Sequence, residues 1–225
     1  PGLTTMVAWT IGGKPTYMFE GFLHVTGSAV QWLRDGLGII ETSAQTEEIA
    51  RYLGESFGAR FSPEEIVVTI GASEAIDAAL RATVDDGDEV LVPDPSYVSY
   101  APCVELCGGK AVSVPCRAEN GFVLTPEAVE RAVTDRTKIL IFPYPNNPTG
   151  GIMTRADVEA LIPVVLKHDL LILADEIYAE LTYGGSHVSA ASFPALKDRV
   201  VLVSGFSKAF AMTGWRIGYV AAPGE

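Results

Sequence analysis

From residue 65 onward, short apolar runs rich in β-branched residues alternate with segments of helical periodicity. A strand that is buried on both faces reads as a continuous apolar run, so this alternation is typical of a parallel sheet covered by helices. We therefore predict an α/β fold with a doubly wound, mostly parallel seven-stranded sheet and helices on both faces. The predicted strands are Ile66–Ile70, Glu89–Val92, Ala111–Val114, Lys138–Phe142, Leu170–Ala174, Val200–Ser204 and Ile217–Ala221.

Helix signals lie between these runs. Thr125 is a predicted N-cap with proline at the next position, which favours a helix over Pro126–Val133. The segment Thr154–His168 opens on a sequence close to a capping box, and the proline inside it, Pro163, predicts a kink. Two further helices are predicted, Ser73–Val84 and an amphipathic one over Thr46–Phe57.

Composition excludes several classes of function. The 225 residues, 48% hydrophobic and 20% charged, suit a folded chain with a sizeable core. The formal net charge of −12 disfavours a nucleic-acid partner, because phosphate binding rests on clustered Lys and Arg. No apolar run approaches the roughly 20 residues of a membrane helix, so the cytoplasm is the expected location. Three cysteines without metal-ligand spacing are interpreted as small buried hydrophobes in a reducing compartment: Cys103, Cys107 and Cys116.

Unusual residues follow one predicted strand after another, at the edge where open α/β sheets bind ligands. After the first strand, Gly71, Ala72 and Ser73 open a helix, whose free amides and dipole favour a phosphate. A glycine at such a place is more often only a turn. After the second strand, Tyr97 stands at the start of a predicted helix, where its ring can stack on a planar ligand. Packing of that helix on the sheet is an equally good interpretation.

Two later strands also end in polar residues. Asn147 lies in the turn Tyr144–Gly150, whose prolines can hold its side-chain amide toward a ligand oxygen. Asp175 follows an apolar strand, where an acid is costly to bury unless a group such as a protonated ring nitrogen pairs with it. An ordinary loop and a helix cap are the respective alternatives.

The last motif is Ser207-Lys208, which follows a predicted buried strand. A lysine in a partly desolvated site loses its proton more readily and becomes a nucleophile toward a carbonyl. Arg216, eight residues on, offers a planar fork suited to phosphate. Most lysines are solvated surface groups, so Lys208 is informative only together with the other motifs.

Taken together, these five segments resemble the class I/II aminotransferases, which are fold-type I pyridoxal-phosphate enzymes related to aspartate and aromatic aminotransferases. The resemblance runs from about Ile66 to Pro223 with order and spacing preserved. It implies that Lys208 holds pyridoxal 5′-phosphate (PLP) as a Schiff base and later moves the proton. It also implies that Asp175 pairs with the pyridine nitrogen.

The remaining roles are implied by the same resemblance. Asn147 and Tyr178 resemble the residues that hydrogen-bond the phenolic oxygen of the ring, and Tyr97 resembles the one that stacks on it. The residues that resemble the family's phosphate-binding site are Gly71, Ala72, Ser73 and Arg216, with Ser207 as a further member. Gly205 stands where the family often has a serine, which implies that one phosphate hydroxyl is missing or replaced.

The implied activity is transfer of an amino group between an L-amino acid and a 2-oxo acid, by a homodimer that binds neither nucleic acid nor membrane. We divide the chain into an atypical N-terminal segment, residues 1–60, and a PLP-binding large domain, residues 61–225. The start at Pro1 suggests a piece of a longer protein, and the family's C-terminal small domain is expected to be absent. The stretch Glu41–Gln45 lacks the tyrosine by which the family reaches the partner subunit's phosphate.

PLP-dependent proteins of other functions share the same cofactor-binding domain. Fold-type I lyases, decarboxylases and cyclopropane-forming synthases are alternatives within the enzyme class, since substrate contacts decide which bond breaks. A truncated, non-catalytic PLP-binding protein, or a PLP-binding sensor domain fused to a transcription regulator, is an alternative of another class. Residues 1–60 show no basic helix-turn-helix pattern, which disfavours the sensor.

Overall fold

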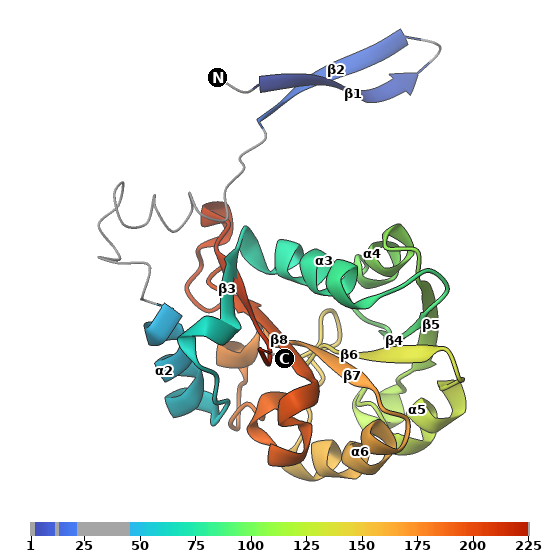
Figure 1. Ribbon diagram of the computed structural model, residues 1–225, viewed down its shortest axis with the longest axis vertical. Helices are drawn as coiled ribbons and strands as arrows, with labels where there is room; N and C mark the ends of the chain where they lie inside the picture. The colour runs from blue at the N-terminus through green and yellow to red at the C-terminus, as the bar shows by residue number, and fades with distance from the viewer. Residues whose placement is uncertain (1–2, 12–13, 22–45, 225) are drawn as a thin grey trace.

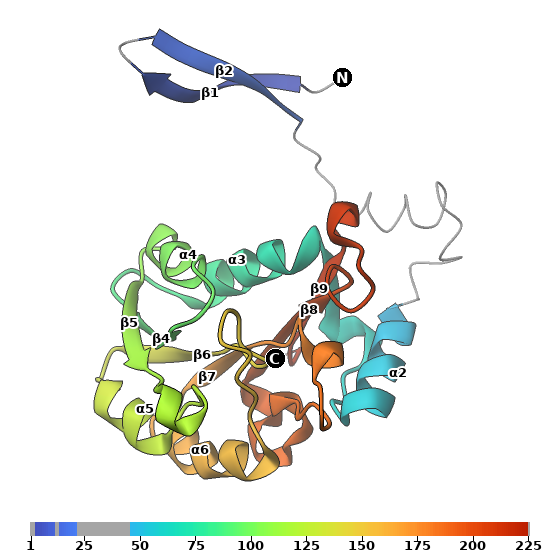
Figure 2. The ribbon, with the colours of Figure 1, turned by 180° about the vertical axis from the view of Figure 1, so that it is seen from behind.

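The structure is a computed structural model that describes residues 3–11, 14–21 and 46–224. Its main body is a seven-stranded sheet with helices on both faces, as predicted (Figures 1 and 2). All seven predicted strands are present, with ends shifted by at most two residues. They are β3 (Ile66–Thr69), β4 (Glu89–Asp94), β5 (Lys110–Pro115), β6 (Thr137–Phe142), β7 (Leu171–Asp175), β8 (Val200–Gly205) and β9 (Gly218–Ala221).

The strand order is β3-β9-β8-β7-β6-β4-β5. Strands β4 to β8 pair in parallel, whereas β9 runs antiparallel to both of its neighbours, β3 and β8. The sheet is therefore mixed, and the prediction of a mostly parallel sheet holds for every strand except β9. Gly218, the first residue of β9, pairs with Thr69 and Gly205, which end β3 and β8. The start of β9 therefore lies at the edge of the sheet where β3 and β8 end.

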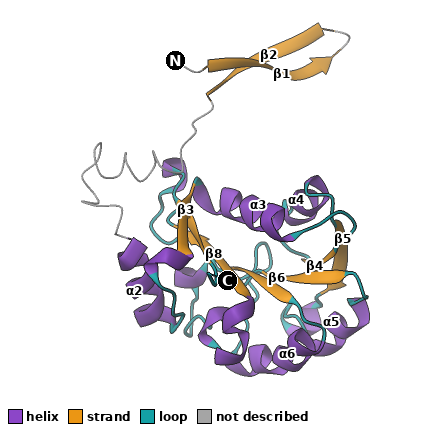
Figure 3. Cartoon of the chain, in the orientation of Figure 1, coloured by secondary structure: helices purple, strands orange, loops and turns teal. Residues whose placement is uncertain are grey.

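Helices alternate with the strands and enclose them from outside (Figure 3). The capping predictions are confirmed: Thr125 accepts a hydrogen bond from the Ala128 amide, and Thr154 from the Asp157 amide in a capping box. Pro163 lies within a helix that continues on both sides of it. The α-helices are α2 (Thr46–Phe57), α3 (Gly71–Thr83), α4 (Tyr100–Leu106), α5 (Pro126–Ala132) and α6 (Arg155–Lys167). Short 3-10 helices are Pro63–Glu65, Ala118–Asn120, Ala179–Leu181, Ala190–Ser192, Pro194–Arg199 and Thr213–Trp215.

Two apolar layers hold the helices to the sheet, because successive strand residues point to opposite faces. One layer joins α3 and α4 to side chains such as Ile139 and Leu173. The other joins α2, α5 and α6 to side chains such as Leu140 and Ile172. Leu53 of α2 is fully buried in this second layer, so the helix before residue 61 packs on the large sheet. The domain boundary at residue 61 stays a prediction.

Some features differ from the prediction or lie outside it. β1 (Leu3–Ile11) and β2 (Lys14–Gly21) pair antiparallel, although no structure was predicted there. The signal was a Gly12-Gly13 pair between two runs, a spacing typical of hairpins. All three cysteines are free; Cys116 is buried as predicted, while two others are only half-buried, Cys103 and Cys107. None of the described helices is long and apolar enough to cross a membrane.

Glu89 is a buried acid at the amino end of β4, and its side chain is 3% exposed. Its carboxylate accepts hydrogen bonds from Lys110 Nζ at 2.8 Å and Thr134 Oγ1 at 2.6 Å. These bonds, with the nearby charges of Lys110 and Arg136, hold the pKa of Glu89 below its ordinary value. The carboxylate therefore stabilises the fold above the unfolded-state pKa, and this contribution is lost as the pH falls through the lower folded-state pKa.

We expect Glu89→Gln to lower the free energy of unfolding by about 2 kcal/mol at pH 7, because a charged acceptor is lost while its donors stay in place. The difference from wild type should narrow as the pH falls below about 4. Urea unfolding of wild type and Glu89→Gln, at pH 7 and below about pH 4, measures this difference in the free energy of unfolding. A difference that is independent of pH would contradict the assignment.

Candidate active site

A pocket of about 290 Å³ opens at the edge where the parallel strands end and β9 begins. Parallel strands present their carboxyl ends at one edge, so residues far apart in sequence meet there. Tyr100, Ile177 and Thr213 belong to the lining but were not predicted as site residues. Nine of the ten predicted site residues line this pocket: Ala72, Ser73, Tyr97, Asn147, Asp175, Tyr178, Ser207, Lys208 and Arg216.

Gly71, the tenth, lies directly behind the pocket wall. A Cβ built on it would be 2.6 Å from Arg216 Nη2, so a side chain there would displace the guanidinium, and its φ of 73° also favours glycine. Arg216 itself has a φ of 52° in the left-handed region, and its Nη1 donates a hydrogen bond to the Thr213 carbonyl at 3.1 Å. The guanidinium is thereby held beside the first turn of α3. Because the first amides of a helix lack partners within it, this end of the pocket suits a phosphate group.

Gly218 sets the distance between β9 and this helix end. A Cβ on Gly218 would be 2.4 Å from the Gly71 carbonyl carbon and 2.5 Å from the Ala72 nitrogen. Both are backbone atoms, which cannot move aside as a flexible side chain can. The close approach of β9 therefore positions the phosphate end of the pocket.

We expect Gly218→Ala to weaken binding of a phosphate-bearing cofactor at least about ten-fold and to destabilise the fold by about 3 kcal/mol, because the start of α3 must shift. Cofactor titration and urea unfolding measure the two effects. Gly214→Ala is the matched control, since its Cβ would have no atom within 4 Å. Equal cofactor affinity and equal stability of Gly218→Ala and Gly214→Ala would show that the close contact of Gly218 with the start of α3 does not position the phosphate end of the pocket.

Asp175 ends β7 and is buried, with 6% of its surface exposed. Its Oδ2 accepts a hydrogen bond from the Tyr100 hydroxyl at 2.6 Å, and its Oδ1 accepts one from the Ile177 amide at 3.2 Å. Burial nevertheless raises the pKa of Asp175 above its ordinary value, against the lowering effect of these two donors. The carboxylate is thus only partly compensated, and a cationic group on a ligand would complete its environment.

Tyr100 is the residue that sequence reasoning missed in this role. Its side chain is 2% exposed, and burial, followed by the charge of Asp175, raises its pKa well above the ordinary value. The prediction that Tyr97 begins the helix was wrong, because α4 begins at Tyr100. Proline is tolerated only in the first turn of a helix, and Pro102 forces this later start. The two tyrosine rings pack edge to face, 5.5 Å apart.

Lys208 follows β8, and its Nζ lies 5.7 Å from the centroid of the Tyr178 ring. It lines the same pocket as Asp175 and Asn147, which is the proximity that the sequence predicts. Its side chain is exposed, so the described residues do not provide the partial desolvation that was predicted for it. The neighbouring Ser207 is buried in the pocket wall.

The turn that carries Asn147 is held by its own hydrogen bonds. The amide of Asn146 donates to the Gly151 carbonyl at 2.9 Å, and the amide of Gly150 donates to the Asn146 carbonyl at 2.8 Å. Thr149 Oγ1 donates to Asn146 Oδ1 at 3.0 Å. These bonds fix the turn, so Asn147 reaches the pocket from a rigid support.

The sequence profile described as "Aminotransferase class I and II" matches residues 38–225. The chain belongs to this family. The aspartate aminotransferase of Geobacillus stearothermophilus is 42% identical over 206 residues, which are 89% of this chain and 52% of that protein. The aspartate/prephenate aminotransferase of Thermus thermophilus is 41% identical over 224 residues, covering 98% of this chain and 57% of that protein.

The fold comparison agrees with the sequence comparison. The crystal structure of an aromatic aminotransferase from Pyrococcus horikoshii OT3 is 40% identical, with a TM-score of 0.80 over 88% of this chain and 56% of that chain. The chain thus spans about half the length of the relatives it matches. The stretch Glu41–Gln45, where a tyrosine of the family was expected to be lacking, lies outside the described residues.

Class I and II aminotransferases use pyridoxal 5′-phosphate as cofactor. The pocket has the features that this molecule needs. The buried carboxylate of Asp175, which is only partly compensated, lines the pocket. The Arg216 guanidinium lies next to Gly71 at the N-terminus of α3. A lysine amine shares the same space. The donors present therefore fit a ring with a basic nitrogen, an aldehyde and a phosphate.

Proposed function

We propose that this chain is the cofactor-binding part of a PLP-dependent aminotransferase, which transfers an amino group between an L-amino acid and a 2-oxo acid. One observation carries the proposal: Lys208, Asp175 and Arg216 line one pocket of about 290 Å³. The names of the relatives, which include aspartate, aromatic-amino-acid and aspartate/prephenate aminotransferases, support amino acids as substrates.

Lys208 and Asp175 have the central roles in this proposal. When bound, PLP supplies an aldehyde that amines can bond and a ring that accepts electrons. Lys208 Nζ is the amine that would bond this aldehyde, and when free it would take and return a proton as general base and acid. The Asp175 carboxylate accepts a hydrogen bond from the ring nitrogen and keeps that nitrogen protonated.

The other predicted residues orient the cofactor. The Asn147 amide and the Tyr178 hydroxyl donate to the phenolic oxygen, and the Tyr97 ring stacks on the ring face. The phosphate is held by the first turn of α3 together with charged and hydroxyl side chains. The proposed phosphate contacts are Ala72, Ser73, Ser207 and Arg216, and Gly71 makes room for the guanidinium beside them.

We further propose residues 61–225 as the large domain of a homodimeric enzyme of amino-acid biosynthesis in the cytoplasm. The resemblance of the sequence to the class I and II aminotransferases supports these assignments. The net charge of −12 agrees with small-molecule substrates rather than nucleic acid.

The direct test is titration of the purified protein with PLP, followed by visible absorbance and reduction with borohydride. We expect a new absorbance band that reduction fixes covalently, and mass spectrometry of the digest should place the label on Lys208. A label on another lysine would refute the assignment. A screen of amino donors on the full-length protein, beginning with aspartate and aromatic amino acids, then identifies the substrate class.

A further inference from the structure

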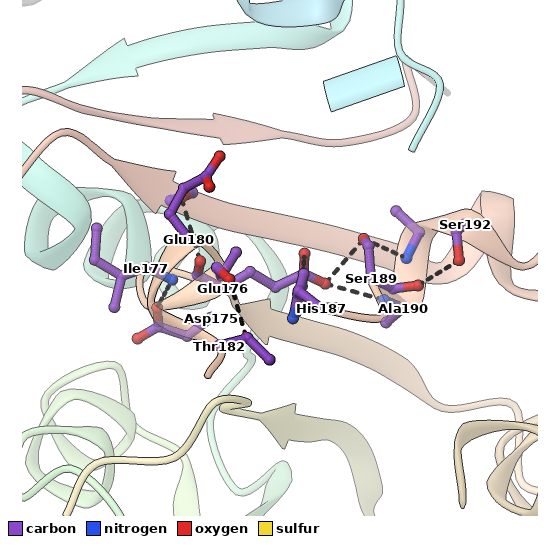
Figure 4. A network of polar contacts seen from close by, with 12 residues as sticks. Asp175, Glu176, Ile177, Glu180, Thr182, His187, Ser189, Ala190 and Ser192 are labelled. Atoms are coloured by element: carbon purple, nitrogen blue, oxygen red, sulfur yellow. Dashed lines mark hydrogen bonds and ion pairs between the residues drawn. The ribbon is translucent and has the colours of Figure 1, made fainter. Parts of the chain in front are cut away.

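Glu176 follows Asp175 directly, and its side chain is 2% exposed. Its Oε1 accepts hydrogen bonds from Ser189 Oγ and the Ala190 amide, both at 3.0 Å. Its Oε2 lies 2.8 Å from His187 Nε2 (Figure 4). All three side-chain contacts come from residues 187–190, so one carboxylate joins the end of β7 to that segment.

The backbone of Glu176 is held as well. Its amide donates to the Val203 carbonyl of β8 at 2.8 Å. Its carbonyl accepts from the Ala179 amide at 3.0 Å and from Ser204 Oγ at 3.4 Å. Main chain and side chain of this residue therefore fix the end of β7 from two directions.

Asp175 and Glu176 serve different spaces. Asp175 and Tyr178 line the cofactor pocket, whereas Glu176 lines a separate cavity of about 250 Å³ that includes Ile49 and Tyr52. Figure 4 shows the two acidic side chains pointing in different directions. Glu176 thus fixes residues 175–178 from the side away from the cofactor pocket. This segment carries Asp175 and Tyr178, the two proposed cofactor contacts.

His187 is the basic partner of this buried acid. Its side chain is 4% exposed, and its ring packs edge-on against Phe57 of α2, with 5.3 Å between ring centroids. The pair therefore links the end of β7 to a helix on the outside of the sheet. Removing one member of a buried, hydrogen-bonded pair leaves the other unsatisfied, which is more costly than losing an exposed contact.

We propose that Glu176 and His187 are positioning residues for the cofactor site. Their buried pair fixes residues 175–178 so that the Asp175 carboxylate faces the ring nitrogen and the Tyr178 hydroxyl faces the phenolic oxygen. This inference rests on the proposed function. Neither Glu176 nor His187 lines the cofactor pocket, so their replacement removes no group that contacts the cofactor.

The test compares PLP dissociation constants, measured by visible absorbance, for wild type, Glu176→Ala and His187→Ala. Glu89→Ala is the matched control, since it removes another buried, hydrogen-bonded glutamate at the opposite edge of the sheet. Urea unfolding without PLP records the general loss of stability in each variant. We expect PLP binding to weaken about ten-fold or more in the two test variants and to stay at the wild-type value in the control.

The conservative variant Glu176→Gln removes the carboxylate charge but keeps the size of the side chain and its Oε1 acceptor. Its Oε1 can still accept from Ser189 and Ala190, so we expect a PLP dissociation constant within about three-fold of wild type. Weakening as large as in Glu176→Ala would overturn the role of these bonds. Where Glu176→Ala does not fold, His187→Ala decides by the same ten-fold criterion.

Two results would overturn the inference in distinguishable ways. Wild-type affinity in Glu176→Ala and His187→Ala, or equal weakening in Glu89→Ala, would refute the positioning role while leaving the proposed function intact. Failure of the wild-type protein itself to bind PLP would refute the proposed function, and the inference with it.

Discussion

Replacing Lys208 with alanine is expected to abolish covalent attachment of PLP and to lower kcat of the full-length enzyme by about a thousand-fold or more. The variant loses both the amine that bonds the aldehyde and the group that moves the proton. PLP should still bind without a covalent bond, because Asp175, Asn147 and Arg216 remain around the pocket. Borohydride reduction followed by mass spectrometry, together with a transamination assay, measures both effects.

The exposure of Lys208 gives this experiment a clean control. An exposed side chain contributes little to folding, so the free energy of unfolding should stay within about 0.5 kcal/mol of wild type. Lys197→Ala removes another exposed lysine and should leave the label and the activity unchanged. Borohydride labelling that persists in Lys208→Ala would place the cofactor on a different amine and end the present interpretation.

Asp175→Asn is expected to lower kcat by about a hundred-fold or more, because an amide cannot keep the ring nitrogen protonated. The same change should stabilise the cofactor-free protein by about 1 kcal/mol near pH 7. Asparagine needs no counter-ion, whereas burial raises the pKa of Asp175 and makes its ionised form unfavourable in the folded state. Function and stability should therefore move in opposite directions.

The pH dependence of this stability difference has a definite sign. Below the unfolded-state pKa, about 4, aspartic acid is neutral in both states, and the two proteins should be similarly stable. As the pH rises through the raised folded-state pKa, wild type loses stability relative to Asp175→Asn. Urea unfolding without PLP across this range measures the difference. An asparagine variant that is less stable at pH 7 would mean that the Tyr100 and Ile177 hydrogen bonds outweigh burial.

Much of the fold is predictable because its signals are local. The strands are buried on both faces, so each reads as an apolar run, and the caps at Thr125 and Thr154 lie where hydroxyl residues precede helical periodicity. Prediction failed at the hairpin β1–β2, where the runs are irregular, and at the start of α4, where Pro102 overrides the expected boundary.

The candidate site is predictable for a related reason. Ligands bind at the carboxyl ends of parallel strands. Asn147, Asp175 and Lys208 each follow a strand, so their positions in the chain alone assign them to the same edge of the sheet. Contacts between distant side chains cannot be assigned in this way. The Tyr100–Asp175 bond joins residues 75 positions apart, and the Glu176–His187 pair depends on the path of a surface loop.

The sequence by itself determined the number of strands in the large sheet, their order along the chain and the residues that follow them. Only the tertiary structure decided that β9 runs antiparallel, which brings Arg216 to the same edge as the end of β3 and the start of α3. In a parallel β9, the same arginine would lie at the opposite edge. The physical reason is that a buried strand has the same apolar pattern in either direction, so its direction is set by pairing with distant strands.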